Sequence, residues 1–139
     1  MPLKLLELKL INGLRELFSM DKLLIICGPT ASGKTALAIE CAKLLKTEII
    51  SADSLYIYTD LNIGTAKPTI EEREGIVHHL IDVAKPTDTF TVSQFRELAE
   101  PIIKKLHSKG KIPIVCGGTG FYINSLIYDL SYGNGEGNP

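Results

Sequence analysis

A glycine-rich stretch near the amino terminus has the residue types and spacing that bind phosphate. Residues 28–35 read GPTASGKT and match the pattern G-x-x-x-x-G-K-[ST] at every fixed position. In this pattern the backbone N–H groups of the loop converge on phosphate oxygens, and the positive end of the following helix lies behind them. The predicted diphosphate- or nucleotide-binding residues are Gly28, Pro29, Thr30, Ala31, Ser32, Gly33, Lys34 and Thr35. Lys34 supplies a cation and Thr35 a hydroxyl suited to Mg²⁺. The pattern leaves the ligand open, because a nucleoside triphosphate and another diphosphate with Mg²⁺ would both satisfy these donors.

Two further loops follow predicted strands and are expected at the same edge of the sheet. Asp53 comes after a short apolar run at 48–52, and residues 117–120, GGTG, come after another at 112–116. Ligands of open parallel sheets bind at the carboxyl ends of the strands, so we expect Asp53 near the phosphate loop. Asp53 could act on a ligand or could cap the next turn. The two glycines could admit a ligand or could only form a turn.

The elements needed to position these loops alternate along the chain. Strands are predicted at 23–27, 48–52, 79–83 and 112–116, and helices at 36–45, 69–75, from 92 onward, and 121–129. The run at 23–27 is apolar without interruption, which is typical of a strand buried on both faces. This order predicts an α/β fold, namely a three-layer P-loop domain with a mostly parallel sheet flanked by helices.

Two predicted helices begin with capping boxes. Residues 69–72 and 91–94 place a threonine three positions before a glutamate or glutamine. Pro101 lies inside the second helix, and we expect a kink or a break there because proline removes one helical hydrogen bond. The apolar face predicted for this helix consists of Phe95, Leu98, Ile102 and Leu106.

Composition and charge limit the classes of function. The chain has 139 residues, 45% of them hydrophobic and 22% charged, as expected for one globular domain. The formal net charge of −1 argues against this segment alone carrying most of a large RNA interface. The three cysteines, Cys27, Cys41 and Cys116, are expected to be buried small apolar residues in a reducing cytosol. No apolar run is long enough to span a bilayer and no signal peptide is recognisable, so a cytoplasmic location is predicted.

The expected organisation has three parts. Residues 1–19 place leucines at helical spacing and form an N-terminal helical extension, with Met20 as a possible natural start. Residues 20–130 form the P-loop core. Residues 131–139 are rich in glycine and are expected to be a linker or tail.

Five motifs in order resemble one enzyme family. They are GPTASGKT at 28–35, IISADS at 49–54, IGTAKP at 63–68, HHLID at 78–82 and GGTG at 117–120. Together they resemble the amino-terminal part of the tRNA dimethylallyltransferase family, also called tRNA isopentenyltransferases. Five motifs in register are far more specific than the phosphate loop alone.

The resemblance implies transfer of a dimethylallyl group from dimethylallyl diphosphate to the exocyclic amine of the adenosine beside the anticodon in tRNA. By this resemblance the loop holds the diphosphate of the donor with Mg²⁺ as cofactor, Asp53 is the catalytic base, and Thr30 helps to orient it. The partners implied are dimethylallyl diphosphate and the tRNA anticodon stem-loop, with no membrane and with a monomer favoured. The positions that correspond to family residues facing the tRNA are Asp53, Ser54, Leu55, Tyr56, Lys67 and Thr119.

Some features depart from the family pattern. Tyr56 stands where members often carry glutamine, so a tyrosine could stack on a base instead of hydrogen-bonding to it. Members are usually considerably longer, and this chain is therefore expected to be a truncated catalytic core. Three other functions stay open, namely an adenylate isopentenyltransferase acting on free adenine nucleotides, an ATP-dependent small-molecule kinase, and a non-catalytic remnant that binds a diphosphate. His78 and His79 could be structural or could bind a metal, and Asp82 could be structural or the acidic end of a nucleotide-hydrolase strand.

Overall fold

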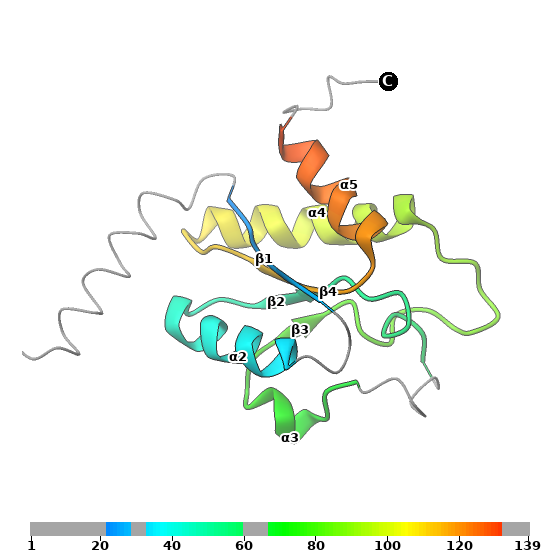
Figure 1. The fold of residues 1–139 in the computed structure, drawn as a ribbon. Coiled ribbons are helices and arrows are strands. Elements are labelled where there is room, and N and C mark those ends of the chain that lie inside the picture. Colours follow the sequence, from blue (N-terminus) through cyan, green and yellow to red (C-terminus); the bar gives the residue numbers. More distant parts are fainter. Residues whose placement is uncertain (1–21, 29–32, 60–66, 132–139) are drawn as a thin grey trace, which may run out of the picture.

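A parallel four-stranded sheet forms the centre of the fold in the computed structural model, which describes residues 22–28, 33–59 and 67–131 (Figure 1). The strands are β1 (Leu24–Cys27), β2 (Ile49–Ser51), β3 (His78–His79) and β4 (Ile114–Gly117). Their order across the sheet is β1-β4-β2-β3, and each pair of neighbours is parallel. The extension at 1–19 and most of the tail predicted at 131–139 lie outside the described residues, so the expectations for them stay predictions; residue 131 itself ends a helix.

Helices cover both faces of this sheet. They are α2 (Lys34–Leu45), α3 (Ile70–Arg73), α4 (Val92–Ser108) and α5 (Gly120–Ser131). In Figure 1, α2 and α3 lie on one side of the strands, and α4 and α5 lie on the other. The predicted three-layer arrangement with a parallel sheet is therefore confirmed. In the described part of the chain, no helix is long and apolar enough to cross a membrane.

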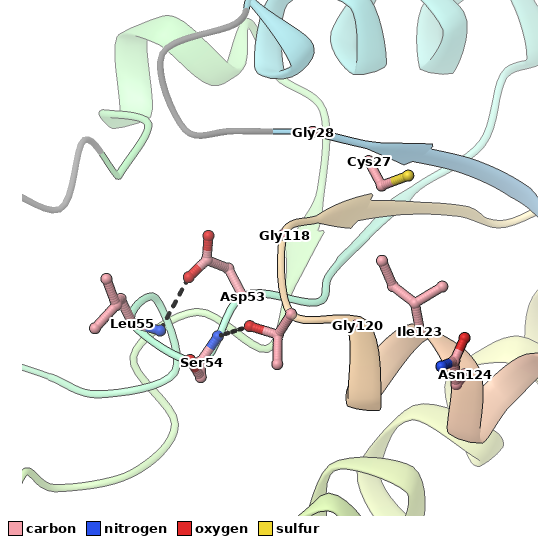
Figure 2. Close-up of a pocket in the computed structure, with 10 residues that line it drawn as sticks. Cys27, Gly28, Asp53, Ser54, Leu55, Gly118, Gly120, Ile123 and Asn124 are labelled. Atoms are coloured by element: carbon pink, nitrogen blue, oxygen red, sulfur yellow. Dashed lines mark hydrogen bonds between the residues drawn. The ribbon is translucent and has the colours of Figure 1, made fainter.

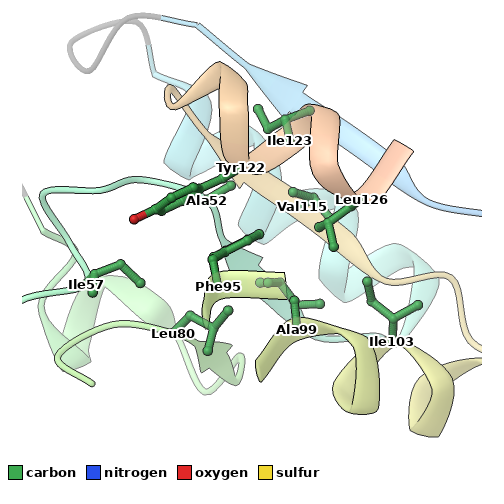
Figure 3. Close-up of a cluster of buried hydrophobic side chains, with 11 residues drawn as sticks. Ala52, Ile57, Leu80, Phe95, Ala99, Ile103, Val115, Tyr122, Ile123 and Leu126 are labelled. Carbon is green, nitrogen blue, oxygen red and sulfur yellow. The ribbon is translucent and has the colours of Figure 1, made fainter. Parts of the chain in front are cut away.

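The alternation of side chains along β2 and β4 divides the core into two clusters. Ile49 and Cys116 belong to the cluster that packs under α2. Ile50 and Val115, one residue away, belong to the larger cluster under α4 and α5, which Figure 3 shows. Successive residues of a strand point to opposite faces, so Ser51 lies on the α2 face with Ile49.

The first strand is less buried than its sequence predicts. Residues 24–26 are only half-buried and Cys27 is exposed. Within the described part of the sheet, β1 lies at the edge and has β4 as its one neighbour. The expectation of a strand buried on both faces is therefore wrong here, and so is the expectation that all three cysteines are buried.

Helix α4 continues through Pro101 from Val92 to Ser108. Of the two expected alternatives, the break is therefore wrong and the kink stays a prediction. Pro101 is exposed and the opposite side of the helix is held in the core. The buried face is also rotated from the predicted one, because Leu98 is 42% exposed whereas Ala99 is fully buried. The buried residues of this helix are Phe95, Ala99, Ile103 and Leu106.

The third strand is shorter than predicted and ends at His79. Leu80 and Asp82 have φ angles of 67° and 58°, in the left-handed region, which extended strands do not use. The chain turns there and then bonds to the segment after β2, where the Asp82 N–H donates to the Tyr56 carbonyl at 2.9 Å. This pairing depends on tertiary contacts that the apolar pattern at 79–83 does not reveal.

Both predicted capping boxes are formed. Thr69 Oγ1 accepts from the Glu72 N–H at 3.1 Å, and Glu72 Oε1 accepts from the Thr69 N–H at 2.9 Å. Thr91 and Gln94 make the same reciprocal pair at 3.1 and 2.8 Å. The starts of α3 and α4 are therefore fixed by local sequence, as predicted.

Candidate active site

A cavity of about 570 Å³ lies where the loops after β1, β2 and β4 meet the start of α5 (Figure 2). This is the carboxyl edge of the parallel strands, where open α/β sheets bind their ligands. The residues that line it are Cys27, Gly28, Asp53, Ser54, Leu55, Gly118, Thr119, Gly120, Ile123 and Asn124. The expected meeting of Asp53 with the beginning of the phosphate loop is confirmed.

Asp53 is 7% exposed and is held by the turn that follows it. Its Oδ1 accepts a hydrogen bond from the Leu55 N–H at 2.9 Å, and the Tyr56 N–H donates to the Asp53 carbonyl at 3.0 Å. The carboxylate therefore caps the turn and also lines the cavity (Figure 2). The two interpretations of Asp53 from sequence are compatible, because the cap occupies one of two carboxylate oxygens.

Thr119 joins the loop after β4 to the loop after β2. Its hydroxyl Oγ1 accepts from the Ser54 N–H at 2.9 Å, and its own N–H donates to the Ala52 carbonyl at 3.1 Å. These two bonds lie on either side of Asp53 in sequence. Thr119 therefore fixes the backbone that carries the carboxylate.

Glycine is required at position 117 by the backbone of Ala52, which directly follows β2. A Cβ atom there would lie 2.3 Å from the Ala52 carbonyl oxygen and 2.4 Å from its carbon, too close for any side chain. The group that approaches Gly117 is thus the backbone at the end of the neighbouring strand, and neither alternative from sequence had proposed this contact. Gly118 does line the cavity, and a Cβ on it would lie 3.3 Å from the Gly28 carbonyl oxygen.

The described part of the phosphate loop is its junction with α2. Gly33 is the N-cap with φ at 81°, a left-handed conformation that glycine adopts without strain. The Cys116 thiol on β4 donates to the Lys34 carbonyl, with Sγ 3.9 Å from the oxygen. Burial raises the pKa of Cys116 to about 11, so the thiol keeps its proton. The predicted phosphate ligands Pro29, Thr30, Ala31 and Ser32 lie outside the described residues.

Two of the residues expected to face tRNA lie apart from the cavity. The Lys67 ammonium is 2.5 Å from Asp82 Oδ1 and also donates to the Tyr58 carbonyl, and its side chain is only 7% exposed. Tyr56 is 6% exposed and lines a second, much smaller cavity. Burial raises the pKa of Tyr56, and the negative charge of Asp53 adds to this effect. Stacking of a base on Tyr56 therefore stays a prediction that the observed burial does not favour.

Three residues of the cavity wall were not predicted from sequence. Cys27 ends β1, while Ile123 and Asn124 lie in the first turn of α5 (Figure 2). Ile123 and Asn124 could have been predicted, because the helix expected at 121–129 begins directly after the GGTG loop and its first turn must lie beside that loop. Cys27 had been expected in the core.

The two neighbouring histidines have structural contacts. His79 Nε2 lies 2.7 Å from Glu48 Oε1, and His78 Nδ1 lies 3.0 Å from the Ile76 carbonyl oxygen. Burial lowers the pKa of His78. Over the described ranges, no group of three or more His, Cys, Asp or Glu side chains could hold a metal ion. The metal interpretation of the histidine pair therefore has no support in this part of the chain.

Comparison with known proteins places the chain in one family. The profile of the IPP transferase family matches residues 56–137. A relative from Acetivibrio thermocellus called tRNA dimethylallyltransferase is 61% identical over 113 residues, which cover 81% of this chain and 36% of the relative. The chain spans about a third of the length of the curated relatives it matches.

Solved structures agree with the sequence match. A full-length tRNA isopentenylpyrophosphate transferase from Bacillus halodurans is 44% identical, with a TM-score of 0.75 over 85% of this chain and 39% of that one. A eukaryotic dimethylallyltransferase acting on tRNA is 36% identical, with a TM-score of 0.71 over 75% of this chain and 26% of that one. The order of motifs, the parallel sheet and these matches lead to one conclusion: the chain belongs to the IPP transferase family.

Proposed function

We propose that this chain carries the catalytic core for transfer of a dimethylallyl group from dimethylallyl diphosphate to the exocyclic amine of the adenosine beside the anticodon in tRNA. The observation that carries the proposal is the cavity in which Asp53 meets the start of the phosphate loop. The relatives named above are tRNA dimethylallyltransferases, which supports this choice over transfer to free nucleotides.

Asp53 is the candidate base. The lone pair of an adenine exocyclic amine is delocalised into the ring, so the amine is a poor nucleophile and benefits from a carboxylate that takes its proton. The turn that uses Oδ1 of Asp53 fixes the direction of the carboxylate. In this proposal Thr30 helps to orient Asp53, and the acceptor base leaves its stack to enter the cavity beside Ser54, Leu55 and Thr119.

The phosphate loop and the first turn of α2 hold the diphosphate. The positive end of the α2 dipole and the Lys34 charge stabilise the negative charge that grows on the leaving diphosphate. The chemistry of the donor set fits Mg²⁺, because the Thr35 hydroxyl is a hard oxygen ligand and Thr35 lines two cavities at the start of α2. Bound Mg²⁺ would neutralise the diphosphate, and Thr35 would hold it.

The experiment incubates the chain with Mg²⁺, labelled dimethylallyl diphosphate and an anticodon stem-loop RNA, and counts label on the target adenosine. The decisive variant is Asp53→Asn, because the amide oxygen can still accept from the Leu55 N–H while the base is lost. We expect transfer to fall by about 10²- to 10⁴-fold, the usual contribution of a general base, with donor binding unchanged.

Asp53→Ala and a free nucleotide complete the design. The alanine variant removes the cap as well as the base, so a larger effect on melting temperature than that of Asp53→Asn separates the two roles. AMP offered in place of the RNA tests the adenylate isopentenyltransferase alternative. Transfer by Asp53→Asn at the unchanged rate, or transfer to AMP in preference to RNA, would contradict the proposal.

A further inference from the structure

Ser51 is a buried polar residue whose hydroxyl is not used by the fold. It is 3% exposed, and none of the described residues supplies a hydrogen-bond partner for its Oγ. A buried hydroxyl without a partner costs free energy, so each instance needs an explanation. Ser51 is also two residues before Asp53, at the end of the strand that delivers the candidate base.

Ser51 lies on the face of the sheet that α2 covers. Ser51 is the register partner of Cys116, and Cys116 belongs to the core cluster under α2. The Cys116 thiol donates to the Lys34 carbonyl. Ser51 and Cys116 are thus adjacent polar groups on the face under α2, and Ser51 shares a cavity wall with Thr35, the residue beside Lys34.

A small cavity lies between Ser51 and Thr35. Its volume is about 10 Å³, close to the least that holds one water molecule. Besides Ser51 and Thr35, its wall includes Tyr56 and His78, which carry a hydroxyl and an imidazole ring. A buried water needs polar side chains of this kind around it. The space is too small for any organic ligand.

We propose that Ser51 is a positioning residue for Thr35. One water in this cavity accepts a hydrogen bond from the Thr35 hydroxyl and donates one to Ser51 Oγ. With its proton engaged in this way, Thr35 Oγ1 would be available as an oxygen ligand for a magnesium ion held with the diphosphate. The inference rests on the proposed diphosphate site, and it applies to that site whichever donor carries the diphosphate.

The test measures Mg²⁺ dependence without enzyme activity. Inorganic diphosphate is titrated calorimetrically into the chain at a series of Mg²⁺ concentrations. We expect Ser51→Ala to raise the Mg²⁺ concentration for half-maximal binding by about tenfold, the lower end of the effect of losing a group that orients a metal ligand. Ser51→Thr keeps a hydroxyl. Its Mg²⁺ concentration for half-maximal binding should lie within about threefold of that of the unchanged chain, a smaller change than the loss of an orienting group causes.

Thr47 offers a matched control. It is 5% exposed, and its Oγ1 also has no hydrogen-bond partner among the described residues, but it lies between α2 and β2, outside the cavity wall. Thr47→Val should leave the Mg²⁺ dependence unchanged. Ser51→Ala should melt no lower than the unchanged chain without Mg²⁺, because the lost hydroxyl had no protein partner.

Three outcomes would overturn the inference. The first is equal Mg²⁺ dependence in Ser51→Ala and the unchanged chain, and the second is an equal shift in Thr47→Val. The third is diphosphate binding by the unchanged chain that does not depend on Mg²⁺. A preference for ATP over the prenyl donor would contradict the proposed function but would not change the effect of Ser51 on Mg²⁺ dependence. Failure of the proposed function and failure of the Ser51 inference can therefore be told apart.

Discussion

Two residues at the carboxyl ends of the strands, Asp53 and Gly117, are fixed by the backbone beside them. Asp53 accepts from the turn that it opens, and Gly117 lies against the Ala52 carbonyl because no side chain fits there. The sequence predicted that both would lie near the phosphate loop. It could not predict that Gly117 is required for strand packing, because that contact joins residues 65 positions apart, and only the paired strands create it.

Replacing Gly117 by alanine should be strongly destabilising. The new Cβ would lie 2.3 Å from the Ala52 carbonyl oxygen, and a backbone atom cannot move aside as a flexible side chain can. We expect the free energy of unfolding to fall by about 1–3 kcal/mol, the usual cost of overpacking, or by more. Urea denaturation followed by circular dichroism measures this.

Gly120→Ala is the matched control. No heavy atom lies within 4 Å of a Cβ at Gly120, and this residue begins α5. Alanine favours helix by about 1 kcal/mol relative to glycine, so this variant should be neutral or more stable. Equal destabilisation by the two variants would contradict the strand-packing explanation.

His78 should make stability depend on pH. Its pKa is lowered from 6.5, chiefly by burial, with the positive charges of Arg73 and His79 acting in the same direction and the Ile76 carbonyl opposing them. As pH falls below 6.5, the His78 imidazole therefore binds a proton in the unfolded chain before it does so in the folded chain. The free energy of unfolding consequently falls as pH falls through this value. His78→Gln should reduce the loss of melting temperature between pH 7.5 and 5.5, measured by circular dichroism. An unchanged loss in His78→Gln would contradict this assignment.

At the scale of elements, the loop after β2 is held by the loop after β4. The Ser54 N–H has Thr119 Oγ1 as its acceptor at 2.9 Å, and the same threonine bonds to the Ala52 carbonyl through its N–H. A resemblance to tRNA-binding positions had singled out Thr119. The structure adds a mechanical role, since this side chain connects the two loops that form the cavity around Asp53.

Thr119→Val should loosen this connection. Valine has nearly the shape of threonine but cannot accept from the Ser54 N–H, and a part-buried donor without a partner costs about 1–3 kcal/mol. We expect that loss in the free energy of unfolding, together with faster amide exchange at Ser54. Thr119→Ser keeps the acceptor and should lose less than half as much. Unchanged exchange at Ser54 in the valine variant would show that the bond does not hold the loop.

The elements predicted well are those that local sequence determines. Both capping boxes formed where the spacing placed them, because each needs only four residues. The buried face of α4 and the end of β3 were predicted less well. The choice of Ala99 over Leu98 for the core depends on how α4 lies against the sheet and α5. The left-handed residues after His79 depend on hydrogen bonds to the segment after β2.

At the scale of the whole molecule, the order of the strands brings three loops to one edge. The strands β1, β4 and β2 are neighbours although β4 comes last in sequence, so the phosphate loop, the Asp53 turn and the GGTG loop meet. The parallel α/β arrangement was predictable from alternating strands and helices. The exposure of β1 could not be predicted, because an apolar strand can have the same sequence whether it has one neighbouring strand or two.

The measurement that tests the central claim most directly is a pair of calorimetric titrations of this chain with Mg²⁺, one with dimethylallyl diphosphate and one with ATP. The prenyl transfer account predicts binding of dimethylallyl diphosphate at least about tenfold tighter than binding of ATP, a difference of about 1.4 kcal/mol in binding free energy. Tighter binding of ATP would contradict the account and would favour a phosphoryl-transfer enzyme built on the same loop.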